Sequence, residues 1–223
     1  MKTTAANLTP YLDKTFHCNA LDLLLRLPSQ SIDSVITDPM YGVAVKPSRS
    51  NTYDWGVDPF GGDPNKWWAY HQPIYEQCRR VLRPGGKLAW AMGSNFYNYF
   101  ATWFGGYRVW SFTRWYVKGI KAFGHIWLVQ TQEGTPIPFP DADSLLIFPP
   151  REAWRGGHPC PKRPEEMEFM VEHLTEPDQI ILDCFAGIGT TLQAAQKLRR
   201  RFIGCDLSQK YCRLAKWSLD YRK

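Results

Sequence analysis

Apolar and polar positions follow two alternating patterns along the chain, which predict strands interleaved with helices. Short apolar runs typical of buried strands occur at residues 15–18, 33–38, 87–93, 179–185 and 201–207. Amphipathic stretches with apolar residues at helical spacing lie at residues 19–28, 67–82, 94–104, 163–178, 187–200 and 208–221. This alternation predicts an α/β fold with a mostly parallel, doubly wound sheet.

Two parts of the chain depart from this alternation. Residues 43–66 are polar and rich in Gly, Pro, Ser and Asp, so we expect a long loop. The β-branched and aromatic runs at residues 108–118, 125–131 and 143–148 are typical of strands that form hairpins. The 223 residues contain no internal repeat, and their number suits a single domain over residues 1–223.

The composition is that of a globular protein with a basic charge: 44% of the residues are hydrophobic and 22% are charged. No apolar run reaches the roughly 18 residues of a membrane span, and the N-terminus lacks a signal-peptide core. We therefore expect a cytoplasmic protein without a membrane partner. The formal charge of +6 favours polyanions such as nucleic acid, and ten Trp supply both core and rings that can stack on bases.

Cysteine spacing predicts neither a disulfide framework nor a metal site. The six cysteines form no CxxC pair, so we expect buried, reduced thiols. His158 near Cys160 could supply half of a metal site, but no second half is spaced to complete it. We therefore expect no metal.

The strand-like run at residues 33–38 leads into the sequence Asp38-Pro39-Met40-Tyr41-Gly42. Asp, Pro and Gly are turn residues, so the simplest interpretation is a turn. However, open α/β sheets bind their ligands at the carboxyl ends of strands. A carboxylate, a rigid proline and an aromatic ring at such an end make this turn a candidate catalytic site.

A second candidate site is the sequence DCFAGIGTT at residues 183–191, which joins a strand directly to a helix. Gly187 and Gly189 allow the backbone to approach a ligand closely, and the helix N-terminus offers free N–H groups. Asp206 ends the next strand, where a carboxylate can accept hydrogen bonds from ribose hydroxyls. Leu192 stands where a dinucleotide turn would carry its third glycine, so the pattern favours a different nucleotide-like cofactor.

Several motifs of the chain resemble those of the β-type, permuted, S-adenosylmethionine-dependent DNA amino-methyltransferases, which methylate N6 of adenine or N4 of cytosine. TDPMYG at 37–42 resembles their catalytic (D/N/S)PP(Y/F) motif, and DCFAGIGTT resembles their FxGxGT cofactor motif. Residues 16–42, 81–94 and 156–174 resemble the segments around these motifs. The resemblance implies a Rossmann-like, seven-stranded methyltransferase sheet in circularly permuted motif order. Helices would cover both faces, and the last strand would run antiparallel beside the fifth.

For catalysis, the resemblance implies that Asp38 and the carbonyl of Pro39 accept hydrogen bonds from the substrate amine. Tyr41 would stack on a base flipped out of the duplex. Asp at position 38 favours N6 of adenine, with N4 of cytosine as the alternative. Met40 stands where the family has a second proline, and we expect it to border the substrate too.

For the cofactor, the resemblance implies S-adenosylmethionine bound next to Asp38. Its ammonium would meet Asp183, its ribose Asp206 and its carboxylate Lys162. Asn19 takes the place of the family's Asp at the adenine edge. The other matching cofactor positions are Phe185, Gly187, Gly189, Thr190 and Thr191.

DNA is the partner that the resemblance implies, and residues 103–157 form the variable segment where the family carries target recognition. Because this segment must also supply strands, we expect a short target, loose specificity or help from a partner chain. The basic residues expected at DNA are Lys46, Arg49, Arg114 and Lys118. A homodimer and a cognate restriction or specificity partner also fit the family, in a prokaryotic cell or a phage-infected host.

Two further functions stay open at this point. Met40 motivates a methyltransferase-like subunit that binds DNA with weak or no catalysis. A dehydrogenase is disfavoured, because the third glycine of the dinucleotide turn is missing.

Overall fold

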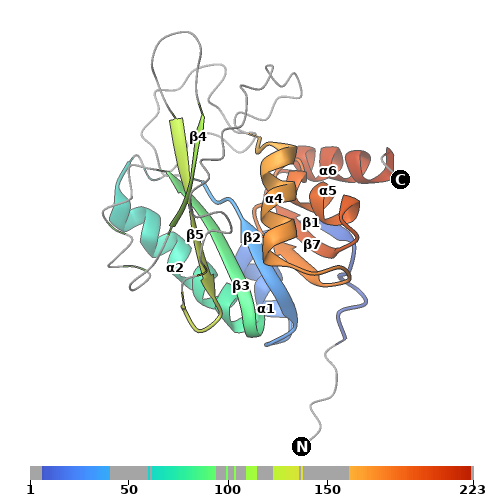
Figure 1. Cartoon of the computed structure of the whole chain (residues 1–223), viewed down its shortest axis with the longest axis horizontal. Helices are drawn as coiled ribbons and strands as arrows, with labels where there is room; N and C mark the ends of the chain where they lie inside the picture. Colours follow the sequence, from blue (N-terminus) through green and yellow to red (C-terminus); the bar gives the residue numbers. More distant parts are fainter. Residues whose placement is uncertain are drawn as a thin grey trace, which may run out of the picture.

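A sheet of seven strands forms the centre of the computed structural model, in the order β1-β7-β6-β2-β3-β5-β4 (Figure 1). The structure describes residues 7–40, 60, 62–93, 99, 103, 109–114, 123–135, 137 and 161–221. Its strands are β1 (Lys14–His17), β2 (Ile32–Thr37), β3 (Leu82–Gly93), β4 (Val109–Arg114), β5 (Phe123–Thr131), β6 (Ile180–Asp183) and β7 (Arg201–Asp206). The sheet is parallel from β1 to β3, and β5 runs antiparallel between β3 and β4. The expected Rossmann-like sheet of seven strands is confirmed.

The described helices are α1 (Ala20–Arg26), α2 (Pro64–Val81), α4 (Pro164–Leu174), α5 (Thr190–Lys197) and α6 (Gln209–Tyr221). Local sequence explains where they begin. Helix α2 starts at Pro64, before the expected start at Trp67, because Asp63 accepts hydrogen bonds from the N–H groups of Asn65 and Lys66. The fixed φ of proline suits the first helical position, both in α2 and at Pro164 in α4.

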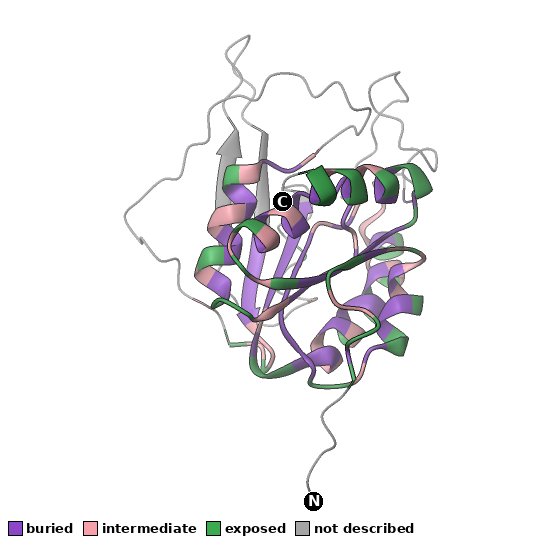
Figure 2. Cartoon of the chain, turned by 90° about the vertical axis from the view of Figure 1, so that its right-hand side faces the viewer, coloured by how far each residue is buried: buried purple, intermediate pink, exposed green. Residues whose placement is uncertain are grey.

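The helices cover the sheet on both faces, as expected (Figure 1). Helices α1 and α2 contribute Leu24 and Ile74 to one core, which also contains Val35 of β2. Helices α4, α5 and α6 pack into the second core with the neighbouring residue Ile36. Figure 2 shows the buried sheet and helix faces inside, with exposed residues on the outer helix faces. Because successive side chains of a strand point to opposite faces of the sheet, β2 contributes residues to both cores.

The position of β2 in the sheet decides where a ligand can bind. All six of its residues are buried, and it lies between β6 and β3. The chain leaves β6 toward β7 on one side of the sheet and leaves β2 toward β3 on the other. Such a reversal of strand order opens a crevice at the carboxyl ends of the two strands. Both sequence motifs lie at this switch point.

Some expectations fall outside the described residues. Of the expected loop at 43–66, the structure describes only Phe60 and the residues from Gly62 onward. Of the expected helix at 94–104 it describes Tyr99 and Trp103, and the expected strand at 143–148 lies outside. Within the described part of the chain, none of the helices is long and apolar enough to span a membrane.

Candidate active site

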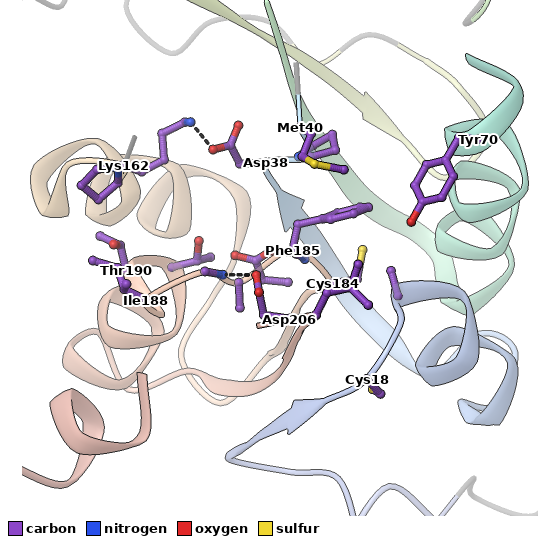
Figure 3. A pocket seen from close by; sticks show the side chains of 18 residues that line it. Cys18, Asp38, Met40, Tyr70, Lys162, Cys184, Phe185, Ile188, Thr190 and Asp206 are labelled. Atoms are coloured by element: carbon purple, nitrogen blue, oxygen red, sulfur yellow. Dashed lines mark hydrogen bonds and ion pairs between the residues drawn. The ribbon is translucent and has the colours of Figure 1, made fainter. Parts of the chain in front are cut away.

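A pocket at the carboxyl ends of the strands brings the two sequence motifs together (Figure 3). Its space, part of which is open to solvent, is about 900 Å³. The lining residues come from the ends of β1, β2, β6 and β7, from α2 and from the segment before α4: Cys18, Ala20, Asp38, Pro39, Met40, Tyr70, Pro161, Lys162, Asp183, Cys184, Phe185, Ala186, Gly187, Ile188, Thr190, Thr191, Asp206 and Leu207. The pocket therefore combines residues from both ends of the chain.

Asp38 directly follows β2 and is held by an ion pair. Its Oδ2 accepts a hydrogen bond from the ammonium of Lys162, whose side chain is only 6% exposed (Figure 3). The Oδ1 atom of Asp38 is buried and has no hydrogen-bond partner among the described residues. The carboxylate thus has one oxygen in an ion pair and one buried acceptor without a partner among the described residues. The expected contact of Lys162 with a cofactor carboxylate stays a prediction.

The turn after Asp38 is held at a second point. The carbonyl of Met40 accepts a hydrogen bond of 2.5 Å from Nε1 of Trp67, in the first turn of α2. Met40 lines the pocket and packs against the core formed by α1 and α2. Tyr41, the expected stacking residue, lies outside the described residues.

Asp183, the last residue of β6, is buried beneath the pocket. Its Oδ1 accepts hydrogen bonds from Oγ1 of Thr37 at 2.9 Å and from the N–H of Phe185 at 3.1 Å. Burial raises the pKa of this carboxyl to about 6, although hydrogen bonds from Thr191, Thr37 and Phe185 oppose the shift. Asp183 therefore changes charge close to neutral pH.

The glycine turn after Asp183 has the conformation that its sequence requires. Gly187 and Gly189 have φ values of +51° and +81°, which side chains other than glycine rarely adopt. A Cβ on Gly189 would lie 2.8 Å from Cβ of Ala215 in α6. Gly189 is also the N-cap residue of α5, and no side chain caps this end. The first N–H groups of α5 are thus open toward a ligand.

Asp206 closes the other side of the turn at the end of β7. Its Oδ2 accepts a hydrogen bond from the N–H of Gly187 at 2.9 Å (Figure 3). Its Oδ1 accepts one from the N–H of Ser208 at 2.8 Å. Each carboxylate oxygen can accept more than one bond, so Asp206 can order the turn and still bind a hydroxyl. Its expected contact with a ribose stays a prediction.

Asn19 has a structural task in this chain. Its Oδ1 accepts a hydrogen bond of 2.8 Å from the N–H of Leu21 and caps α1. Its neighbours Cys18 and Ala20 line the pocket, whereas Asn19 is not among the described lining residues.

A hydrogen bond with Cys205 lowers the pKa of the Cys18 thiol to about 7. The five described cysteines are free thiols; four of them are buried as expected, whereas Cys18 is partly exposed.

An aromatic wall supports the pocket from the side of α2, and this feature is missing from the sequence predictions. The ring of Phe185 lies 5.8 Å from that of His71 and 6.3 Å from that of Trp90. His71 donates from Nδ1 to the carbonyl of Trp67 at 2.8 Å, and burial lowers its pKa to about 3. It is therefore a neutral ring in a packed cluster. Only the aromatic residues at the start of α2 hint at this wall in the sequence.

The residues expected to contact DNA lie largely outside the described part of the chain. Arg114 is the last residue of β4, of which the structure describes the backbone. Lys46, Arg49 and Lys118 lie outside the described residues.

The arrangement suits a small ligand that carries both a cation and hydroxyl groups. Carboxylates end β6 and β7, open N–H groups begin α5, and the ring of Phe185 lines the wall between them. Asp38 borders the same pocket. A second reactant that donates hydrogen bonds can therefore meet this ligand at the end of β2.

Comparisons with known proteins show which sequences and folds this chain is similar to. Residues 114–217 match the N6/N4 methyltransferase family model, which is described as DNA methylase. The type II methyltransferase M.BglII of Bacillus subtilis is 25% identical over 92% of this chain and 68% of that protein. M.HpaI of Haemophilus parainfluenzae is 25% identical over 94% of this chain and 75% of that protein.

Two solved structures share the fold over most of their length. The cytosine-N4-specific PvuII DNA methyltransferase superposes with a TM-score of 0.69 and 16% identity over 91% of this chain and 84% of that chain. M1.HpyAVI, solved with S-adenosylmethionine, has a TM-score of 0.63 and 21% identity, and the match covers 92% and 98% of the two chains. This chain is therefore similar to S-adenosylmethionine-dependent DNA amino-methyltransferases, with its Asp38 turn placed before the glycine turn in the sequence.

Proposed function

We propose that this chain transfers the methyl group of S-adenosylmethionine to the exocyclic N6 amine of an adenine flipped out of DNA. The observation that carries the proposal is the carboxylate of Asp38. Asp38 borders the pocket that also contains the glycine turn, and its Oδ1 is a buried acceptor without a hydrogen-bond partner among the described residues. An acceptor in this place can bind the N–H group of an amine.

The residues around the pocket fit the cofactor. Asp183 can meet the ammonium, because its carboxyl ionises near pH 6 and a nearby cation would favour the charged form. Asp206 can accept hydrogen bonds from the ribose hydroxyls, and Phe185 offers a ring beside them. Lys162 carries a positive charge that can also reach a carboxylate, and Thr190 and Thr191 border the same end. When bound, S-adenosylmethionine supplies a methyl group on a positively charged sulfur.

Asp38 performs the chemistry that the protein itself contributes. An amine conjugated to a base is a poor nucleophile, because its lone pair is delocalised into the ring. Hydrogen bonds to Asp38 and to the carbonyl of Pro39 would localise that lone pair on nitrogen. A bond from nitrogen to the methyl carbon then forms while the bond from carbon to sulfur breaks. The proton that the amine loses passes to Asp38 directly or through water.

The choice of adenine rests on Asp38, since the family resemblance associates this residue with N6 of adenine. The base must leave the duplex to reach the pocket, and Tyr41 would then stack on it. Lys46, Arg49, Arg114 and Lys118 would bind the phosphates, which supply much of the affinity of such proteins. A homodimer and a restriction or specificity partner remain part of the proposal.

Radiolabelled S-adenosylmethionine and DNA test the proposal directly. After incubation, the DNA is digested to nucleosides and the label is assigned by chromatography. Label in N6-methyl-2′-deoxyadenosine is the expected result, whereas label in N4-methyl-2′-deoxycytidine would establish the alternative base. Cofactor binding without any transfer would favour a non-catalytic DNA-binding subunit.

The proposed role of Asp38 in methyl transfer is tested by replacing this residue. Asp38→Ala should abolish transfer while cofactor affinity, measured by calorimetry, stays close to that of the wild type. Transfer by this variant at the wild-type rate would overturn the role of Asp38.

A further inference from the structure

We infer that Trp67 is a positioning residue, which fixes the Asp38–Met40 turn for methyl transfer through its hydrogen bond to the carbonyl of Met40. The inference rests on the proposed function, because it assigns Trp67 a part in that reaction. Trp67 itself does not line the described pocket. It acts on the reaction through the turn.

The hydrogen bond joins two elements that are distant in sequence. Nε1 of Trp67 lies 2.5 Å from the carbonyl oxygen of Met40, and the two residues are 27 positions apart. Trp67 is fully buried. An indole N–H can only donate, and when buried it needs an acceptor, so this bond satisfies a group that would otherwise be costly to bury.

The orientation of the indole is set by the rings around it. The ring of His71 stacks on the indole with 4.3 Å between the ring centroids and 28° between the ring planes. The ring of Trp103 stacks on it with 5.4 Å between the centroids and 23° between the planes. Trp103 in turn stacks on Trp68 at 5.2 Å with an angle of only 6°. Because the indole is held in this array, the direction of its N–H is fixed before any ligand binds.

The turn is therefore held from both faces of the sheet. Lys162, just before α4, binds Oδ2 of Asp38, whereas Trp67 of α2 binds the carbonyl of Met40. Helices α2 and α4 belong to opposite layers of the fold. Pro39 between these two points has a fixed φ. All three residues of the turn are thus restrained.

The hydrogen bond from Trp67 also restrains the backbone at position 40, which a methionine side chain does not restrain. Methionine leaves φ free, whereas the second proline of the family motif would fix it. A carbonyl oxygen lies in the plane of the peptide bond that follows it, so holding the Met40 carbonyl fixes that plane. Trp67 thereby orients the backbone where the chain leaves the turn. Small misplacements of reacting groups cost large factors in rate, so this restraint should appear in kcat.

Two matched variants test the inference. Trp67→Phe keeps an aromatic ring but removes the N–H. Trp90→Phe makes the same change in a fully buried residue of the same aromatic cluster, whose Nε1 has no hydrogen-bond partner among the described residues. We expect Trp67→Phe to lower kcat by about 10- to 100-fold, with cofactor affinity changed less than about twofold. Trp90→Phe should leave kcat within about threefold. Equal loss in both variants, or wild-type kcat in Trp67→Phe, would overturn the inference.

An NMR measurement tests the hydrogen bond between Trp67 and Met40 without requiring enzymatic activity. Met40-Tyr41 is the only Met-Tyr pair in the sequence, so protein labelled with carbonyl-¹³C Met and ¹⁵N Tyr gives one correlated NMR signal for this carbonyl. Loss of the hydrogen bond in Trp67→Phe should move this carbonyl signal upfield, and Trp90→Phe should leave it in place. An unmoved signal in Trp67→Phe overturns the inference.

The two readouts also separate this inference from the proposed function. If the wild-type protein transfers no methyl group to DNA, the proposed function fails and the role of Trp67 in it fails as well. The NMR signal then still decides whether Trp67 holds the turn. If transfer is normal and only the predicted loss of kcat is absent, the inference alone is wrong.

Discussion

Thr37 donates a hydrogen bond of 2.9 Å from its Oγ1 to Oδ1 of Asp183, and these residues are 146 positions apart in the sequence. Thr37 ends β2 directly before the Asp38 turn, and Asp183 ends β6 directly before the glycine turn. The two strands are parallel neighbours in the sheet. A single side-chain bond therefore links the two halves of the candidate active site.

Replacement of Thr37 by valine removes this bond while keeping the shape of the side chain. We expect Thr37→Val to lower the free energy of unfolding by about 1–2 kcal/mol at pH 7, because the bond stabilises a buried carboxylate. Urea denaturation measures this loss. Ser34→Ala is the control on the same strand, since Ser34 donates to a neutral carbonyl, that of Lys87 at 3.0 Å. A loss in Thr37→Val no greater than in Ser34→Ala would contradict the prediction.

Cofactor affinity should depend on pH through Asp183. Its folded-state pKa is raised to about 6, so the carboxyl is neutral below that pH and charged above it. The proposed contact with the cofactor ammonium requires the charge. Affinity measured by calorimetry should therefore rise with pH, with a slope approaching tenfold per pH unit below about pH 6. Asp183→Asn should bind more weakly at pH 7.5 and lose this slope; an unchanged slope would exclude Asp183 as its source.

His71 should make the protein less stable in acid. Its pKa is lowered from 6.5 to about 3 by burial, so the folded protein keeps it neutral while the unfolded chain takes up a proton below pH 6.5. This contribution to stability is present above pH 6.5 and is lost as the pH falls, by about 2 kcal/mol between pH 7 and pH 5. His71→Phe should reduce the fall in unfolding free energy over that interval by this amount. The same fall in variant and wild type would contradict the assignment.

Two glycines with similar backbone conformation should respond differently to alanine. Gly85 and Gly189 have φ values of +73° and +81°, so alanine strains both. Beyond its chain neighbours, no atom of the described residues lies within 4 Å of a Cβ added at Gly85, whereas a Cβ at Gly189 would meet Cβ of Ala215 at 2.8 Å. Gly85→Ala should cost about 1 kcal/mol, and Gly189→Ala about 2–4 kcal/mol, as strain and overpacking combine. Thermal unfolding measures the loss of stability in both variants. Equal losses would contradict the prediction, because they would show that α6 moves away from the added Cβ without cost.

Sequence patterns predicted most of the described elements, because helices and strands depend on the spacing of nearby apolar residues. The runs around Val35 and Ile181 became β2 and β6, and the stretch around Met170 became α4. Glycine at positions 187 and 189 predicted the conformation of the turn for a local reason, since only this residue adopts such φ values without strain. The side chain of Asn19 caps α1, which the sequence pattern did not predict, and its expected place at the adenine edge of the cofactor stays a prediction.

The order of the elements and the two strand-end motifs were thus determined by the sequence itself, through local spacing and turn chemistry. The partners of those motifs were decided only by the tertiary structure: Lys162 for Asp38, Trp67 for Met40 and Thr37 for Asp183. Each pair joins residues far apart in the chain, and the contact exists because strand order brings β2 beside β6 and places α2 and α4 on opposite faces of the sheet. A local pattern carries no information about that order. For Met40, the sequence showed a missing proline, and the fold supplied the indole that restrains the turn.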